Sequence, residues 1–317
     1  KKKRTVVDVG VEVGSGRRRV TGLVIKRGLK ARNRAKQVAK LARVNNKAAK
    51  LFATGAVPQS AYGGQVWGYK PRWMAAMRAA GAKCAGLNTS GICPFVTNQL
   101  VLGDFKDPGI TLRVGQLREW LHVWRTRLPL RARVRRTWQG KLEELADEST
   151  RWGRITGPEG AIIGCLLEVG WQPREAELWV DPSGEEWSLA GPLAMRDFSE
   201  HFARTIVLHL ARRASESHCS TGLETGFDPK VCRLFLRHLE RQDDHARARL
   251  LLTLLCNGAW AQKRKFDAGL VGDARCPRCG GADEDEFHRY WKCPANALCE
   301  IGHGTIAVSS QDLMESR

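Results

Sequence analysis

Four metal-ligating side chains near the C-terminus constrain the fold of this chain more than any other feature. They form a Cys-x2-Cys-x8-His-x4-Cys pattern made of Cys276, Cys279, His288 and Cys293. Two thiolates three positions apart can reach one metal ion when a tight turn joins them, and Gly280-Gly281 follows the second thiol. Three thiolates and one imidazole are a tetrahedral set that suits zinc. The pattern therefore predicts a structural zinc ion, because four protein ligands leave no open position for catalysis.

Two details of this predicted zinc site stay open in the sequence. Cys299 and His303 are a second thiol–imidazole pair that could replace Cys293 or His288. The ring of His288 needs a partner for its second nitrogen, and the carboxylate of Glu284 or Glu286 could supply it.

The distribution of charge indicates a polyanionic partner. The 317 residues carry a formal net charge of +19, and residues 1–50 contain seventeen Lys or Arg against only Asp8 and Glu12. Residues 283–286, in contrast, are all acidic. This asymmetry favours a nucleic-acid partner. The two alternatives are a basic surface that only keeps the protein soluble and a surface that binds an anionic membrane. The expected partners are RNA, DNA or an RNA–DNA hybrid.

The expected location is intracellular and nuclear. No run of about 18 apolar residues predicts a membrane span, and no apolar signal segment precedes the ten cysteines. Most of these cysteines lie in apolar or helical contexts, which favours a reducing compartment. Lys1-Lys2-Lys3-Arg4 could act as a nuclear-import patch. Because the chain begins with Lys, we expect it to be a piece of a longer protein.

The apolar periodicity predicts a mainly α fold with short β-hairpins, of the α+β class. A strand over Val6–Val13 is expected to open a hairpin at residues 14–16, and a second hairpin is expected over 177–189. Residues 24–53 predict one long basic helix, or two helices joined near Asn45-Asn46. Residues 143–149 are polar and predict a linker. Further helices are predicted over 71–82, 114–127, 192–213, 228–241 and 245–257.

Four segments of the chain resemble parts of one protein family. Phe287-His288-Arg289-Tyr290-Trp291-Lys292-Cys293-Pro294 closes the metal pattern, and Leu250–Cys256 leads into it. Asp8-Val9-Gly10-Val11 precedes the basic run Arg17-Arg18-Arg19, and residues 55–63 read Gly-x-x-Pro-x-x-x-Tyr-Gly. Taken in chain order, the segments resemble the part of LINE-type non-LTR retrotransposon reverse transcriptases that runs from the thumb to the zinc knuckle.

The resemblance and the polar stretch over 143–149 together predict a division into four parts. These are a basic thumb-like helical module over 1–110, a basic helical connector over 111–150, a helix and hairpin module of unknown role over 151–243, and a helical lead-in with the zinc finger over 244–317. The parent protein would be an RNA-directed DNA polymerase whose palm holds Mg²⁺ on paired aspartates. The chain lacks a Tyr-x-Asp-Asp motif, so the palm and fingers are expected elsewhere in that parent and no catalytic residue is expected here. Asp243-Asp244 instead predicts a helix cap.

Basic side chains on the predicted helices and in the basic N-terminal run are the expected phosphate contacts. These candidates are Arg17, Arg18, Arg19, Lys30, Arg32, Arg34, Lys36, Arg131, Arg133, Arg135 and Arg136. Trp120, Trp124 and Trp138 could stack on bases, although tryptophans at helical spacing more often pack in a core.

Other interpretations compete with the one in which the chain binds nucleic acid as a part of a polymerase. The chain could be a stand-alone zinc-stabilised RNA-binding, DNA-binding or interaction protein derived from such an element, or a decayed reading frame. Asp181 could be the first carboxylate of a ribonuclease H-like site with Asp197 and Glu200. A type I turn that closes a hairpin explains Asp181 without catalysis.

Overall fold

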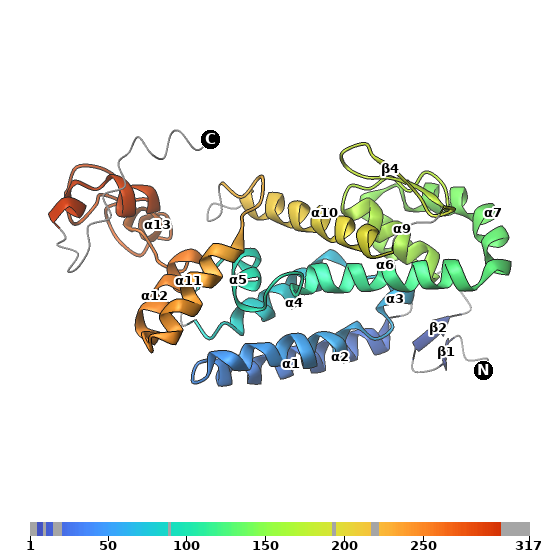
Figure 1. The fold of residues 1–317 in the computed structure, drawn as a ribbon, viewed down its shortest axis with the longest axis horizontal. Coiled ribbons are helices and arrows are strands. Elements are labelled where there is room, and N and C mark those ends of the chain that lie inside the picture. Colours follow the sequence, from blue (N-terminus) through green and yellow to red (C-terminus); the bar gives the residue numbers. More distant parts are fainter. Residues whose placement is uncertain are drawn as a thin grey trace. The chain divides into compact units, whose positions relative to one another are not determined.

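The computed structural model describes residues 5–8, 11–14, 21–87, 90–191, 195–216 and 222–298. The chain divides into two compact units, Lys1–Gly258 and Ala259–Arg317. The described residues are mainly helical, at 67% helix, with two short antiparallel hairpins (Figure 1). This composition confirms the predicted α-rich class. The finer division at residues 110, 150 and 243 stays a prediction.

The first unit is built from helices of very different lengths. In chain order they are α1 Gly22–Ala42, α2 Val57–Ala61, α3 Gly64–Trp67, α4 Pro71–Lys83, α5 Pro94–Val101, α6 Pro108–Thr126, α7 Leu128–Leu145, α8 Glu148–Arg154, α9 Gly157–Glu168, α10 Met195–Ser215, α11 Pro229–Arg241 and α12 His245–Leu255. A 3₁₀ turn, η1 Asn46–Ala49, and a π-helical turn, η2 Phe52–Ala56, connect α1 to α2.

The N-terminal segment is a hairpin of two strands. β1 Thr5–Asp8 pairs antiparallel with β2 Val11–Gly14, and Asp8 lies opposite Val11. The predicted single strand over Val6–Val13 was therefore wrong, because the chain reverses direction after Asp8. The carboxylate of Glu12 accepts a hydrogen bond from the backbone N–H of Leu23 at 2.8 Å, which ties β2 to the start of α1.

Small residues place α1 against its neighbours. Ala31, Ala35 and Ala42 are buried on its inner face, so the helix approaches η2 and α4 closely. The helix ends at Ala42, and Asn45 caps the following turn η1, where its side chain accepts a hydrogen bond from the backbone N–H of Lys47 at 3.0 Å. Two helical segments joined near Asn45-Asn46, one of the two predicted alternatives, are thus present.

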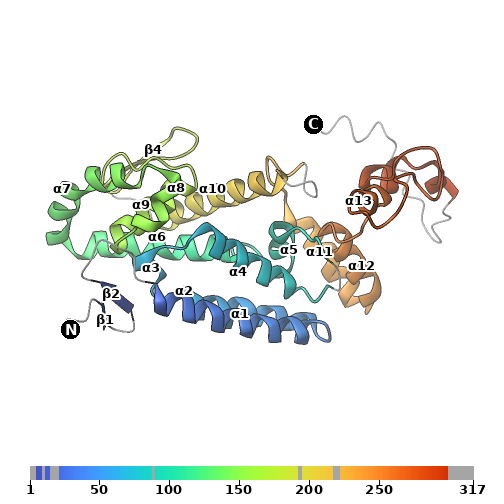
Figure 2. The same ribbon diagram turned by 180° about the vertical axis from the view of Figure 1, so that it is seen from behind.

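Helix α6 is the central element of the first unit (Figures 1 and 2). Most of its length is buried, and it packs against α3, α4, α7, α9 and α10. Its start is fixed by Asp107, a fully buried N-cap that accepts hydrogen bonds from the backbone N–H of Gly109 at 2.6 Å and from Asn98 Nδ2 at 3.1 Å. Arg78 Nε of α4 donates to the same carboxylate at 3.0 Å. This network joins three helices at one point.

The middle of the chain shares a hydrophobic core with α6. Trp120 and Trp138 contact each other within the same buried cluster as Ile162 and Phe198. The predicted linker over 143–149 was wrong, since α7 continues through Leu145 and Asp147 caps α8 two residues later. The predicted second hairpin is confirmed as β3 Leu178–Val180 paired with β4 Glu186–Ser188.

The first unit closes with the helical pair α11 and α12. Asp244 caps α12 through the backbone N–H of Arg247 at 3.1 Å, as the sequence predicts. The backbone N–H of Cys93 donates to the carbonyl of Cys256 at 2.9 Å and connects the end of α12 to the start of α5. Across the described residues, no helix combines the length and apolar character that a membrane span requires.

Candidate metal centre and basic surfaces

The second unit brings the four predicted metal ligands together. It contains the short helix α13 Gln262–Asp267, a π-helical turn η3 His288–Lys292, and a 3₁₀ turn η4 Pro294–Leu298. Between α13 and η3, Arg275 and Asp283 form an isolated antiparallel bridge. This bridge encloses the segment that carries Cys276 and Cys279.

A tight turn aims the first two thiols at the same point. The backbone N–H of Gly280 donates to the carbonyl of Cys276 at 2.8 Å. Gly280 has a φ of 66°, in the left-handed region that a residue with a Cβ rarely adopts. The glycine that follows the second thiol is thus needed for the turn itself.

The π-helical turn η3 aims the other two ligands. Residues five apart are about 140° apart around an α-helix, so the spacing from His288 to Cys293 does not suit an α-helical turn. In η3 the backbone N–H of Cys293 instead donates to the carbonyl of His288 at 2.8 Å, an i to i+5 bond. The wider turn returns both side chains to one side.

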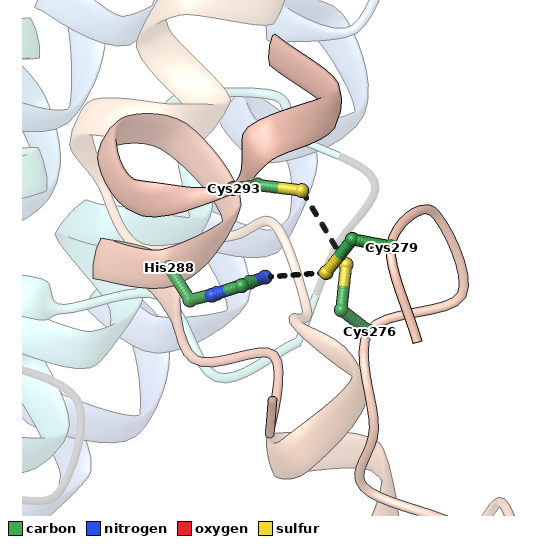
Figure 3. Close-up of side chains that lie close together, drawn as sticks. All are labelled: Cys276, Cys279, His288 and Cys293. Carbon is green, nitrogen blue, oxygen red and sulfur yellow. Dashed lines mark hydrogen bonds between the residues drawn. The ribbon is translucent and has the colours of Figure 1, made fainter. Parts of the chain in front are cut away.

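The four ligand atoms have the spacing of a tetrahedral metal site. All of them lie within 4.8 Å of one another (Figure 3). The Sγ atoms of Cys276 and Cys293 are 3.7 Å apart, and Cys279 Sγ lies 3.3 Å from His288 Nε2. Ligands at zinc bond lengths of about 2.3 Å for sulfur and 2.0 Å for nitrogen stand about 3.5–3.8 Å apart. The cluster could therefore hold a metal ion such as zinc.

The electrostatics of the cluster favour a thiolate at Cys276. Burial raises the pKa of Cys276, but hydrogen bonds from the backbone N–H groups of Cys279 and Arg278 outweigh it, and the pKa is lowered overall. The pKa of Cys293 is raised, chiefly by burial. Metal ligation requires deprotonated thiols, so a cation in the cluster would be favoured as pH rises.

Glu284 supports the cluster in a different way from the one predicted. Its side chain is buried, and its Oε2 accepts a hydrogen bond from the backbone N–H of Gln262 at 2.8 Å, at the start of α13. Arg289 lies 3.6 Å from the same oxygen, and Cys276 Sγ lies 3.8 Å from Oε1. Glu284 therefore links α13 to the metal cluster, whereas the sequence suggested it as a partner for His288. The alternative ligands Cys299 and His303 lie outside the described residues.

Helix α1 is strongly basic. Its 21 residues contain seven Lys or Arg and no Asp or Glu. Lys30, Arg32 and Lys36 are exposed. Arg34 is also exposed but donates a hydrogen bond to the carbonyl of Gly55 at 3.3 Å, so it helps to hold η2.

The basic residues of α7 separate into two groups. Arg133 and Arg136 are exposed on the helix surface. Arg131 donates to the carbonyl of Trp124 at 2.7 Å, and Arg135 pairs with Glu177 at 2.7 Å. Arg131 and Arg135 therefore have structural partners that compete with a phosphate. Arg17, Arg18 and Arg19 lie outside the described residues.

Buried tryptophans do not offer stacking surfaces in the first unit. Trp120, Trp124 and Trp138 are 7%, 3% and 1% exposed, and Trp120 packs against both of the others. Core packing, the more common role, is confirmed. The sequence does not by itself identify the exposed aromatic side chains around His288 in the second unit, namely Phe287, Tyr290 and Trp291. Their position directly after the acidic run and beside a metal ligand could have indicated a surface.

Asp181 makes hydrogen bonds that close a hairpin turn and reach α10. Its Oδ1 accepts hydrogen bonds from the backbone N–H groups of Ser183 and Glu185, and its Oδ2 lies 2.7 Å from His201 Nε2 of α10. The backbone N–H of Gly184 donates to the Asp181 carbonyl at 3.0 Å, which closes the hairpin turn. Glu200, a partner in the ribonuclease H-like alternative, pairs with Arg196. The turn interpretation therefore explains Asp181.

Comparison with protein-family models, with curated proteins and with solved structures finds no match to this chain.

Proposed function

We propose that this chain binds nucleic acid through α1 and a zinc-stabilised C-terminal module. The observation that carries the proposal is the charge of α1, which exposes Lys30, Arg32 and Lys36 on a helix without any acidic residue. A phosphate backbone neutralises exposed cations of this kind and releases the counterions of both partners. The cations of α1 would hold a nucleic-acid strand without reading its sequence.

A structural zinc ion is the second part of the proposal. Cys276, Cys279, His288 and Cys293 would hold it, and Glu284 would fix α13 to the same cluster. The second unit is small and contains few buried apolar residues, so a metal would supply much of its stability. The zinc would fix the backbone around Phe287 and Trp291, whose exposed rings could stack on unpaired bases.

The resemblance of the sequence to LINE-type reverse transcriptases suggests the biological role. In such a protein, α1 would belong to a thumb that grips the RNA template or the RNA–DNA hybrid beside a palm in the same parent chain. The role of a stand-alone RNA-binding or DNA-binding protein is the second candidate, and the exposed aromatic rings of the second unit favour it.

Binding of the zinc-loaded chain to matched 20-nucleotide single-stranded RNA, RNA–DNA hybrid and duplex DNA tests these roles. Fluorescence anisotropy over a salt series gives the affinity and the number of phosphate contacts for each. Preference for the hybrid would support the thumb-like role, and preference for single strands would support the stand-alone role. If none of the three binds with a salt-dependent affinity, the proposed function is wrong.

A further inference from the structure

A pocket of about 520 Å³ lies in the first unit, and no residue of α1 lines it. It is lined by side chains of α5 and α10 and by the segments that precede α6 and α11. Its size is within the range of small-molecule sites. Phe95 is buried at the pocket and contacts Phe227 edge to face, with ring centroids 5.8 Å apart. Phe227 is half-buried and Phe105 is exposed, so these two lining rings supply the aromatic surface that an occupant could contact.

One buried polar group in the pocket has no partner. Gln99 lies one helical turn after Phe95, lines the pocket, and is 4% exposed. Its Nε2 is buried and makes no hydrogen bond to any described residue. An unsatisfied buried donor costs about 1–3 kcal/mol, so a group that accepts from it is expected in the working protein.

The rim of the pocket carries two available cations. Arg204 of α10 and Lys230 of α11 are exposed, and their side chains make no hydrogen bond or ion pair to the described residues. The two carboxylates at the rim are already engaged. Asp104 pairs with Arg233 at 2.6 Å, and Asp228 accepts from the backbone N–H of Lys230 as the cap of α11. The rim therefore favours an anion.

A strained aromatic residue completes the rim. Phe105 has a φ of 55°, which is rare for a residue with a Cβ, and its ring is 43% exposed. The hydroxyl of Thr111 donates to the carbonyl of Phe105 at 2.8 Å and holds this conformation. Non-glycine residues held in this region often lie at ligand sites.

We propose that this pocket binds one unpaired nucleotide of the nucleic-acid strand that the chain holds. The base would lie against the rings of Phe105 and Phe227, and the Gln99 side chain would turn toward the pocket so that Nε2 donates a hydrogen bond to it. Its phosphate would lie between Arg204 and Lys230. This inference rests on the proposed function for the identity of its ligand, but the pocket can be tested without any strand.

The test uses ligand-observed NMR titration of the full chain with AMP, CMP, GMP and UMP in turn. We expect saturable binding of at least one of them with a Kd of about 1 mM or tighter. Gln99→Met keeps the volume and removes the amide, so it should weaken binding by roughly fivefold or more without lowering Tm. Arg204→Gln should weaken binding of the nucleotide but not of the corresponding nucleoside.

Arg237→Gln is the matched control, because Arg237 is exposed on α11 outside the pocket. The proposal is overturned if no nucleotide saturates, or if Gln99→Met leaves the affinity unchanged. It is also overturned if Arg237→Gln weakens binding as much as Arg204→Gln does. Binding of nucleic-acid strands, measured separately on the same samples, tests the proposed function. If the chain binds such strands but no mononucleotide, the pocket proposal is wrong and the proposed function stands.

Discussion

The backbone N–H of Cys293 donates to the carbonyl of His288 at 2.8 Å, so two candidate metal ligands five residues apart share one π-helical turn. π-helical turns are rare, and they occur often at functional sites. Here the turn converts a spacing that an α-helix cannot use into a pair of side chains that face Cys276 and Cys279 (Figure 3).

Removal of the metal should unfold the second unit selectively. The purified chain is expected to contain one zinc ion per chain by elemental analysis. Cys279→Ser should abolish this stoichiometry, because one thiolate of four is lost. Hydrogen exchange should then show loss of protection in residues 262–293, with protection of α6 unchanged. Retention of one zinc in Cys279→Ser would contradict the assigned ligand set.

Glu284 should stabilise the metal-bound second unit through its carboxylate oxygen. Glu284→Gln keeps an acceptor for the backbone N–H of Gln262, whereas Glu284→Ala leaves that N–H without a partner. We expect Glu284→Ala to lower the free energy of unfolding by about 1–3 kcal/mol, and Glu284→Gln to lower it by less. Zinc competition with a fluorescent chelator measures the effect of each variant, because zinc binding and folding of the second unit are coupled. Equal effects of the two variants would argue against the hydrogen bond as the cause.

The buried carboxylate of Asp107 should be essential for the first unit. Asp107→Ala removes the cap of α6 and leaves the guanidinium of Arg78 without its buried partner. We expect a loss of about 3–5 kcal/mol in urea unfolding. The control is Asp104→Ala, which breaks an ion pair in which the Asp104 side chain is 48% exposed and should cost about 1 kcal/mol or less. Similar losses for the two variants would contradict the proposed importance of burial.

Histidine 209 should make the first unit sensitive to acid. Burial, together with Arg113, Arg213, Arg78 and Arg212, lowers the pKa of His209 from 6.5 to about 4. Between these values the unfolded chain binds the proton and the folded chain does not. The free energy of unfolding should therefore fall by at most about 3 kcal/mol as pH decreases from 6.5 to 4. Above pH 6.5 His209 is neutral in both states and causes no such loss.

His209→Leu should flatten this part of the pH dependence, measured as urea midpoints across the same pH range. His238→Leu is the control, because His238 is exposed on α11. An unchanged slope in His209→Leu would show that other groups cause the acid sensitivity.

The sequence predicted the local features whose physical cause is local. The spacing of Cys276 and Cys279, the cap at Asp244 and the hairpin around Asp181 depend on residues that are near in sequence, and all three match the structure. The structural role of Trp138 also follows from helical spacing. These features indicate the α-rich class, but they do not determine how the helices pack.

Features that depend on distant contacts could not be predicted. The buried ion pair of Asp107 depends on Arg78, which is 29 positions away. The roles of Arg131 and Arg135 become evident only once Trp124 and Glu177 are placed beside them. The contact of Glu284 with the backbone N–H of Gln262 was not predicted, because the two residues are 22 positions apart in sequence. The π-helical turn also has no clear sequence signal apart from the ligand spacing itself.

The charge of α1 is the central claim, and charge reversal tests it most directly. The variant Lys30→Glu, Arg32→Glu, Lys36→Glu is compared with Lys106→Glu, Arg118→Glu, Arg237→Glu, which makes the same change in net charge at exposed sites outside α1. Anisotropy titrations with the preferred nucleic acid over a salt series measure both. We expect the α1 variant to bind at least roughly tenfold more weakly at low salt, with a salt slope smaller by about 2–3, and the control to stay near wild type. Equal weakening of the two variants would show that net charge, and not α1, governs binding, and would contradict the proposed role of this helix.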